Sequence, residues 1–236
     1  MKSGLSISPL LAVEAALAKA SFELPPTSKL IKFPVPELRR FAAREAIFSQ
    51  GEPAGEVFQI AQGAVMVLRE LSGGRRQILD IAGPGRFIGL TRGAAHDCSA
   101  VALRDAAVDC HDRRRAHDAF HGVDFTAAMF DEIHRLRDLA TSLGRKTAIE
   151  RLAGFFLATI GGETEAEEPV ELMLPVSRQE IADHLGMVIE TVCRNFSLLK
   201  RQGLIRVEGK YGLTLLDPAA LRQIVRGVAL PDRLAG

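Results

Sequence analysis

The sequence predicts an α+β protein with a glycine-rich antiparallel β-roll, a long helix and a pair of short helices followed by a small hairpin. Three observations predict it. Short β-rich runs interrupted by glycine extend from Ile47 to about Val108. Apolar residues then recur at spacings of four and three between Phe125 and Thr147. Finally, the segment Ser177 to Ile205 reads as two amphipathic helices around a glycine.

The β-roll is predicted from turn signals that recur roughly every ten residues. These signals are Gly51, Gly55, Gly63, Gly73-Gly74, Gly83-Pro84-Gly85 and Gly89. The stretch Ser72–Arg75 is typical of a hairpin tip, between strands that end at Leu71 and begin at Arg76. Before the roll, the interrupted apolar run Leu5–Leu17 predicts an amphipathic helix that packs on the body. We expect residues 1–122 to form one sensor-like domain.

The long helix carries a regular apolar seam of the kind that pairs two helices across about three heptads. The seam residues are Met129, Ile133, Leu136, Ala140 and Leu143. Gly144 weakens the helix near its end, so residues 123–146 are interpreted as a dimerisation helix and hinge. The alternative is that this seam docks on the β-roll of the same chain.

The last domain is expected over residues 147–236, beginning with an amphipathic helix from Ala148 to Ile160. Ser177 with Glu180 three residues later forms a capping box, and Gly186 suits the turn between two helices. The second of these helices buries Val192, Phe196 and Leu199. The segments Leu204–Val207 and Tyr211–Leu215 follow as a hairpin, which completes a winged helix-turn-helix.

The exposed face of the second helix carries Glu190 and Arg194, one turn apart. Arginine can bind guanine through two hydrogen bonds, and glutamate can accept one from cytosine, so this pair is suited to reading bases in a DNA major groove. We expect the two side chains to form an ion pair that holds the guanidinium in one pose. The alternative is a solvated surface ion pair with no such role.

Composition favours a local rather than a general affinity for DNA, because the formal net charge is only +1. Basic residues cluster in the winged segment, while the acidic stretch Glu163–Glu171 is expected to be a loop facing away from DNA. No segment is expected to span a membrane. The three cysteines form no C-x-x-C pair or disulfide framework, which is typical of a cytoplasmic protein.

An enzyme of a different class, a metal-dependent cupin-like β-barrel, is the alternative function. Six histidines could supply ligands, but no H-x-H pair followed by a glutamate occurs on an expected strand. His111, His117 and His121 fall in a charged connector that is expected to be helical. A solvated surface explains them better, so no catalytic residue and no metal site are predicted.

The helix-turn-helix segment SRQEIADHLGMVIETVCRNFSLLKRQGLI resembles that of the Crp/Fnr superfamily, named after the cyclic-AMP receptor protein and the fumarate–nitrate reduction regulator. The resemblance is strongest to the FixK-like branch, and it continues through Val57–Leu90 and Leu143–Leu157. It implies a homodimeric transcription regulator, an activator, that binds double-stranded DNA and contacts RNA polymerase. It also implies a cyclic-nucleotide-type β-roll, with the polymerase contact near Ser72–Arg76.

The residues argue against two effectors found in that superfamily, cyclic AMP and an iron–sulfur cluster, so no cofactor is predicted. In nucleotide-binding members a glutamate follows the Phe-Gly of the phosphate cassette, but here Leu90 stands at that place. The stretch Asp97–Val101 offers no cation for a phosphate, although Arg86 and Arg92 lie nearby. An iron–sulfur cluster needs four thiolates, and none precedes Cys98. A repressor, or a relative gated by an unknown small molecule, remains the alternative regulator.

The resemblance also assigns roles to residues of the motif. Glu190 and Arg194 match the base-reading positions, and Ile189 could meet a thymine methyl. The Cys193 thiol is small and polar enough to approach the backbone or a base. The residues predicted to contact phosphates are Ser177, Arg178, Gln179, Thr191 and Lys200. The implied target is a TTGA-N6-TCAA-type palindrome.

Two positions depart from the family pattern. Val188 replaces the usual Ser or Thr cap of the second helix. Cys193 replaces serine, and two readings stay open: a passive substitute, or a thiol whose oxidation to sulfinic or sulfonic acid abolishes DNA binding.

Overall fold

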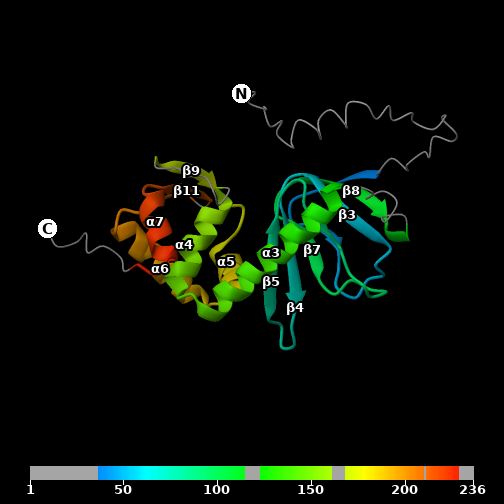
Figure 1. Cartoon of the computed structure of the whole chain (residues 1–236), viewed down its shortest axis with the longest axis horizontal. Coiled ribbons are helices and arrows are strands. Elements are labelled where there is room, and N and C mark those ends of the chain that lie inside the picture. The colour runs from blue at the N-terminus through cyan, green and yellow to red at the C-terminus, as the bar shows by residue number, and fades with distance from the viewer. Residues whose placement is uncertain (1–36, 115–122, 161–167, 210, 229–236) are drawn as a thin grey trace, which may run out of the picture. The chain divides into compact units, whose positions relative to one another are not determined.

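The computed structural model describes residues 37–114, 123–160, 168–209 and 211–228 (Figure 1). The first eight strands form two four-stranded antiparallel sheets, in the orders β1-β8-β3-β6 and β2-β7-β4-β5. The strands are β1 Glu37–Phe41, β2 Ala46–Phe48, β3 Glu56–Gln62, β4 Val65–Glu70, β5 Arg76–Ala82, β6 Phe87–Ile88, β7 Ser99–Ala102 and β8 Ala106–Asp112. The predicted β-roll is therefore confirmed, and so is the hairpin tip between β4 and β5. The helix predicted at Leu5–Leu17 lies outside the described residues.

The core of the roll is built from inward-facing apolar residues of both sheets. Ile60, Val65 and Val108 are fully buried there, and the rings of Phe48 and Phe58 stack with centroids 5.4 Å apart. The roll is longer than predicted at both ends, because β1 begins at residue 37 and β8 continues to residue 112. His111 consequently lies on strand β8, and the prediction of a helical connector there is wrong. His117 and His121 lie outside the described residues.

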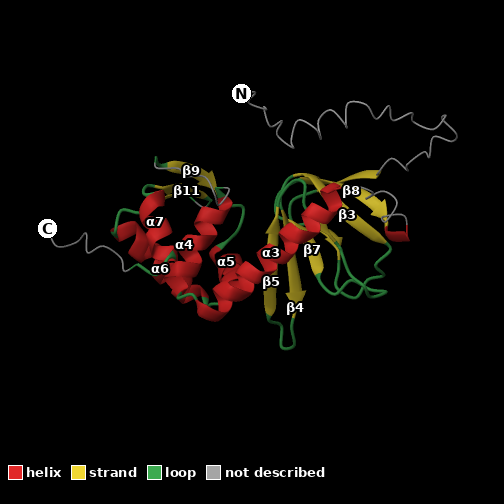
Figure 2. Ribbon diagram, in the orientation of Figure 1, coloured by secondary structure: helices red, strands yellow, loops and turns green. Residues whose placement is uncertain are grey.

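Helix α3 connects the roll to the last domain, which begins with helix α4 (Figure 2). Helix α3, Val123–Arg145, passes through Gly144 without a break, and α4 spans Ala148–Thr159. Thr147 caps α4 with a capping box that includes Glu150, so the chain turns at residues 146–147, directly after the predicted hinge. Within the described ranges no helix has both the length and the apolar character needed to cross a membrane.

The last domain is a winged helix-turn-helix, as predicted. Its elements are β9 Val170–Met173, α5 Arg178–Leu185, α6 Ile189–Arg201, β10 Ile205–Glu208, β11 Gly212–Leu215 and α7 Pro218–Val225. The three strands form an antiparallel sheet in the order β10-β11-β9. Strand β9 was not predicted: Glu171 pairs with Thr214 in this sheet, so the expected acidic loop does not extend to Glu171. Phe156 of α4 and Leu199 of α6 are fully buried in the domain core.

Helix α5 also contacts the β-roll, and several of these contacts are polar. Gln77 Nε2 donates to the His184 carbonyl oxygen at 3.1 Å, and the His184 ring nitrogen Nδ1 lies 3.2 Å from the Ile78 oxygen. A carbonyl can only accept, so the proton is on Nδ1. Arg76 Nε lies 2.6 Å from Asp183 Oδ2. Together these contacts hold the outer side of α5 against strand β5.

Arg44, in the turn between β1 and β2, forms an ion pair with Glu180. Arg44 has a positive φ of 72°, an uncommon backbone conformation for a residue other than glycine. Glu180 is buried and also accepts a hydrogen bond from the Ser177 backbone at 2.7 Å. Burial alone would raise the pKa of Glu180, but the hydrogen bonds from Arg44 and Ser177 outweigh it and hold the pKa below its ordinary value.

We predict that Glu180 makes the free energy of unfolding decrease as the pH falls. Its pKa is lower in the folded than in the unfolded chain, so the unfolded chain binds the proton first. The stabilisation is therefore present above the unfolded pKa of about 4.5 and is lost as the pH falls through the folded value. Urea unfolding followed by circular dichroism should show Glu180→Gln less stable than wild type at pH 7, with a smaller difference near pH 4. Glu171→Gln, at an exposed residue, is the control; a difference that does not shrink in acid would contradict the prediction.

Candidate nucleic-acid interface

The start of α5 is fixed by a reciprocal capping box. The Ser177 hydroxyl accepts from the Glu180 backbone at 3.2 Å, and the Glu180 carboxylate accepts from the Ser177 backbone. Helix α5 ends at Gly186, whose φ of 61° is in the left-handed region that favours glycine. An added Cβ at Gly186 would lie 3.0 Å from Leu143 Cδ2, so the turn of the motif is in close contact with the end of α3.

Helix α6 divides into a buried stripe and an exposed one. Val192, Phe196 and Leu199 point into the domain core, as predicted. The exposed stripe contains Glu190, Cys193, Arg194 and Ser197. Because these four residues are not needed for packing, α6 presents a continuous polar surface to solvent. That is the arrangement of a recognition helix that enters a major groove.

The side chain of Arg194 is oriented by Thr191 and not by Glu190, the partner that was predicted. Arg194 Nη2 donates to the Thr191 hydroxyl oxygen at 3.3 Å. No ion pair joins Glu190 to Arg194 in the described part of the chain, so the predicted ion pair is wrong. Thr191 is one turn away on the same face and holds the arginine through a neutral hydrogen bond. The Glu190 carboxylate is therefore exposed and available for a contact of its own.

Arg178, predicted to contact a phosphate, is half-buried. Its guanidinium carbon lies 2.9 Å from the centroid of the Phe196 ring, and its Nη1 atom is buried without a hydrogen-bond partner. Burial lowers the pKa of Arg178, while the Cys193 thiol acts in the opposite direction. Cys193 itself is a free and exposed cysteine.

The other predicted phosphate contacts lie on accessible parts of the motif. Gln179 is exposed and its amide donates to Asp183 Oδ1 at 2.7 Å. Lys200 is exposed in the last turn of α6, and Ile189 is half-buried at its first turn. Val188 makes no side-chain cap hydrogen bond, as expected of a residue without a hydroxyl.

The β4–β5 hairpin lies next to the helix-turn-helix motif. The sequence analysis did not predict this proximity. Leu71 and Arg75 line the same hollow, of about 850 Å³, as Gln179, Val188 and Glu190. The hairpin and the motif are more than a hundred residues apart in the chain, as the 107-residue separation of Arg76 and Asp183 illustrates. No local sequence signal could have joined them.

The predicted seam on α3 is only partly free. Ile133 and Leu136 are 42% and 49% exposed, and Ala140 is also exposed. Met129 and Leu143 are half-buried, and Leu143 approaches Gly186 of the same chain. Phe130 was not predicted to belong to the seam, yet it is 60% exposed. The free apolar strip of α3 is therefore centred on Phe130, Ile133 and Leu136.

In the part of the roll that corresponds to the phosphate cassette, Arg86 already forms ion pairs with carboxylates of the same chain. Arg86 forms ion pairs with Asp80 and, at 2.7 Å, with Glu132 of α3. Asp97 pairs with Arg69 at 2.6 Å, and Leu90 is exposed. Among the described residues, no group of three or more His, Cys, Asp or Glu side chains could hold a metal ion.

Comparison with known proteins agrees with this geometry. Residues 150–224 match the Crp-like helix-turn-helix domain, and residues 38–120 match the cyclic nucleotide-binding domain. The chain is 32% identical to the nitrogen fixation regulation protein FixK of Rhizobium meliloti, over 75% of this chain and 82% of that protein. It is 34% identical to FixK of Azorhizobium caulinodans, over 78% and 77% of the two chains.

A solved structure, that of FixK2 from Bradyrhizobium japonicum, is also similar. It shares 34% identity with a TM-score of 0.70, over 80% of this chain and 96% of that one. These relatives are transcription regulators and not enzymes, so the cupin-like alternative is set aside. The chain belongs to the Crp/Fnr family of DNA-binding transcription regulators, in its FixK-like branch.

Proposed function

We propose that this protein is a homodimeric activator that binds a TTGA-N6-TCAA-type palindrome. The observation that carries the proposal is the exposed stripe of α6, in which the side chains of Glu190 and Arg194 are exposed to solvent and do not pack in the domain core. The proposed division is a sensor-like domain over residues 1–122, a dimerisation helix and hinge over 123–146, and a DNA-binding domain over 147–236.

The chemistry of the stripe supports base reading. The Arg194 guanidinium can donate to guanine O6 and N7 together, and the Glu190 carboxylate can accept from a cytosine amino group. Ile189 is placed one residue before Glu190, where an apolar side chain can meet a thymine methyl. Cys193 directly precedes Arg194 on the same exposed surface and can approach a neighbouring base.

Phosphate contacts are assigned to the flanks of this stripe. Ser177 and Gln179 at the start of α5, with Thr191 and Lys200 on α6, are the proposed ligands. Arg178 belongs to this set only if its guanidinium leaves the Phe196 ring when DNA binds. Such contacts position the protein on the duplex but carry no sequence information.

A second copy of the chain is the proposed occupant of the apolar strip on α3. Parallel pairing of two such helices would place the two recognition helices in successive major grooves, roughly 34–36 Å apart. The proposed seam is Met129, Ile133, Leu136, Ala140 and Leu143, with Phe130 added from its exposure. A palindromic target follows from the two-fold symmetry of such a dimer.

We further propose that the protein works in the cytoplasm without cyclic AMP or an iron–sulfur cluster. The ion pairs of Arg86 with Asp80 and Glu132 support independence from cyclic AMP, because this arginine already has carboxylate partners that a phosphate would have to displace. Activation is supported by relatives named as activators, such as the transcriptional activator protein FnrL of Cereibacter sphaeroides. Contact with RNA polymerase is proposed for the hairpin tip at residues 72–76.

Arg194→Ala should lower affinity for the palindrome by about 1–3 kcal/mol per half-site and relax selectivity at one base pair. Lys200→Ala should weaken binding to all duplexes alike and reduce the salt dependence by about one unit of slope. Fluorescence anisotropy with the palindrome and single-base variants, over a salt series, measures both. An equal loss on every duplex for Arg194→Ala would contradict base reading.

Ile133→Asp should convert the dimer to a monomer, because a buried unpaired carboxylate is costly in an apolar seam. His134→Asp introduces a carboxylate at the adjacent exposed residue and should leave the dimer intact. Analytical ultracentrifugation and binding to the full palindrome measure the effect. Dimers of equal stability in both variants would place the interface elsewhere.

Peroxide should abolish DNA binding by the wild type through oxidation of Cys193, because a sulfinate or sulfonate adds negative charge opposite the phosphates. Cys193→Ser should retain binding after the same treatment, whereas Cys98→Ser should behave as wild type. The measurement is anisotropy, with mass spectrometry to locate the added oxygen atoms. Equal loss in wild type and Cys193→Ser would favour the passive reading of this thiol.

A further inference from the structure

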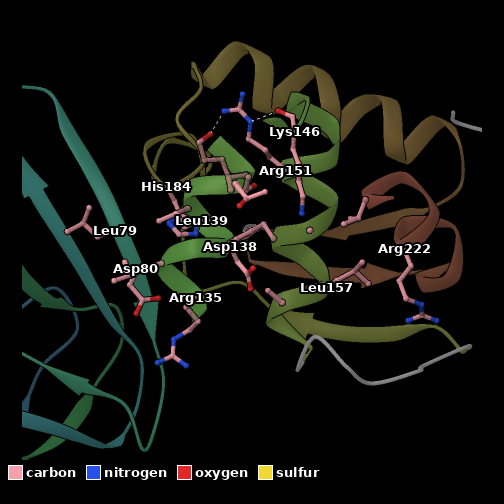
Figure 3. Close-up of a pocket in the computed structure, with 18 of the residues that line it drawn as sticks. Leu79, Asp80, Arg135, Asp138, Leu139, Lys146, Arg151, Leu157, His184 and Arg222 are labelled. Atoms are coloured by element: carbon pink, nitrogen blue, oxygen red, sulfur yellow. Dashed lines mark hydrogen bonds between the residues drawn. The ribbon is translucent and has the colours of Figure 1, made fainter. Parts of the chain in front are cut away.

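A cavity of about 560 Å³ lies between α3, α4 and α7, next to strand β5 and the end of α5 (Figure 3). Apolar side chains form much of its wall: Leu136, Leu139, Phe155, Leu157 and Val225. Its volume is within the range of pockets that hold drug-sized molecules. The cavity is separate from the cassette of the β-roll, since none of residues 87–101 lines it.

At one end of the cavity, two carboxylates already form ion pairs with arginines of the same chain. Asp80 lies there near Arg135 (Figure 3), and Glu132 of α3 also lines the cavity. Arg86 pairs with both carboxylates, and Arg135 Nη2 lies 2.8 Å from Glu132. Burial raises the pKa of Asp80, while Arg86 acts in the opposite direction. These carboxylates therefore leave little charge to attract a cation.

The other end of the cavity carries positive charge without carboxylate partners. Lys146 and Arg151 lie there (Figure 3), and neither forms an ion pair with any described residue. The Arg151 guanidinium donates instead to the carbonyl oxygens of Lys146 and Leu185, at 3.0 and 2.8 Å. Hydrogen bonds to neutral carbonyls fix its position but leave its charge uncompensated. Asp138 also lines the cavity without an ion pair to a described residue, and Lys146 and Arg151 together exceed it by one positive charge.

A glycine keeps the cavity open. Gly154 lies in the middle of α4 and lines the cavity, although glycine is a poor residue for a helix interior. An added Cβ would meet only Val225 Cγ2, at 3.8 Å, an ordinary contact distance. Packing therefore does not require glycine at this position. A longer side chain would project into the space beside Val225.

We propose that this cavity is a binding site for a small organic anion, with its charged group at Lys146 and Arg151 and an apolar body against Leu139 and Phe155. The uncompensated charges select an anion, and the apolar wall excludes a fully hydrated one such as inorganic phosphate. The cavity of about 560 Å³ can accommodate either an aromatic or an aliphatic body.

The position of the cavity gives the anion a regulatory role, which rests on the proposed function. Its walls come from the proposed dimerisation helix α3, from β5 of the roll and from α4 and α7 of the DNA-binding domain. The proposed anion lies against Leu139 of α3 and Phe155 of α4, so its affinity changes when these two helices move relative to one another. Linkage then requires that it alter DNA affinity by the same factor by which DNA alters its own binding.

The direct test uses 8-anilinonaphthalene-1-sulfonate, an anion with an aromatic body, whose fluorescence rises in apolar surroundings. We expect saturable binding of one molecule per chain, displaced by octanoate but not by octylammonium or by inorganic phosphate. Lys146→Gln should weaken binding by about tenfold, the usual effect of losing one charge-assisted hydrogen bond. Arg40→Gln, at an exposed arginine of β1, should leave it unchanged.

Gly154→Leu should abolish the binding by filling the cavity, whereas Gly154→Ala adds only the Cβ and should retain it. Circular dichroism verifies that both variants fold. Binding that survives Gly154→Leu would place the dye elsewhere and overturn the proposal. Equal displacement by octanoate and octylammonium would overturn the assignment to an anion.

The coupling is tested by the DNA affinity of the unmodified protein with and without saturating octanoate. We expect a change of at least about fivefold, the lower end of allosteric coupling. A DNA affinity that octanoate does not change would overturn the regulatory role. Whether the cavity binds an anion would still be decided by the dye experiments. Failure of the anion-free protein to bind the palindrome would count against the proposed function instead, so the two failures are distinguishable.

Discussion

The position of the recognition helix depends on the packing of α5 on both of its sides. One side of α5 buries Ile181, Ala182 and Leu185 in the core of the DNA-binding domain. The other side meets the β-roll through Arg44, Arg76 and the Ile78 carbonyl. Because Glu180 is both the partner of Arg44 and half of the capping box, one carboxylate connects the local structure of the helix to its contact with the roll.

Local features of the motif could be predicted because their causes are local. A capping box spans three residues, a left-handed glycine ends a helix at its own position, and a buried stripe needs only helical periodicity. The same reasoning failed where the partner is distant. Arg44 and Glu180 are 136 residues apart, and the hairpin reaches the motif across a similar separation.

The misses in secondary structure and at the site have related causes. Strand β9 has only four residues and is stabilised by pairing with β11, which no local pattern reveals. His111 was placed in a helix by its charged neighbours, but pairing with Val57 keeps it in β8. The spacing of Glu190 and Arg194 on α6 was compatible with an ion pair, but the Arg194 guanidinium donates to the Thr191 hydroxyl instead.

The contact between Gly186 and Leu143 has a mechanical consequence. A Cβ added at Gly186 would lie 3.0 Å from Leu143 Cδ2, so any other residue there would require the Leu143 side chain to shift. A displacement of the end of α3 would therefore reach this turn through the Leu143 side chain. From the turn it would pass to α6, which begins three residues later at Ile189.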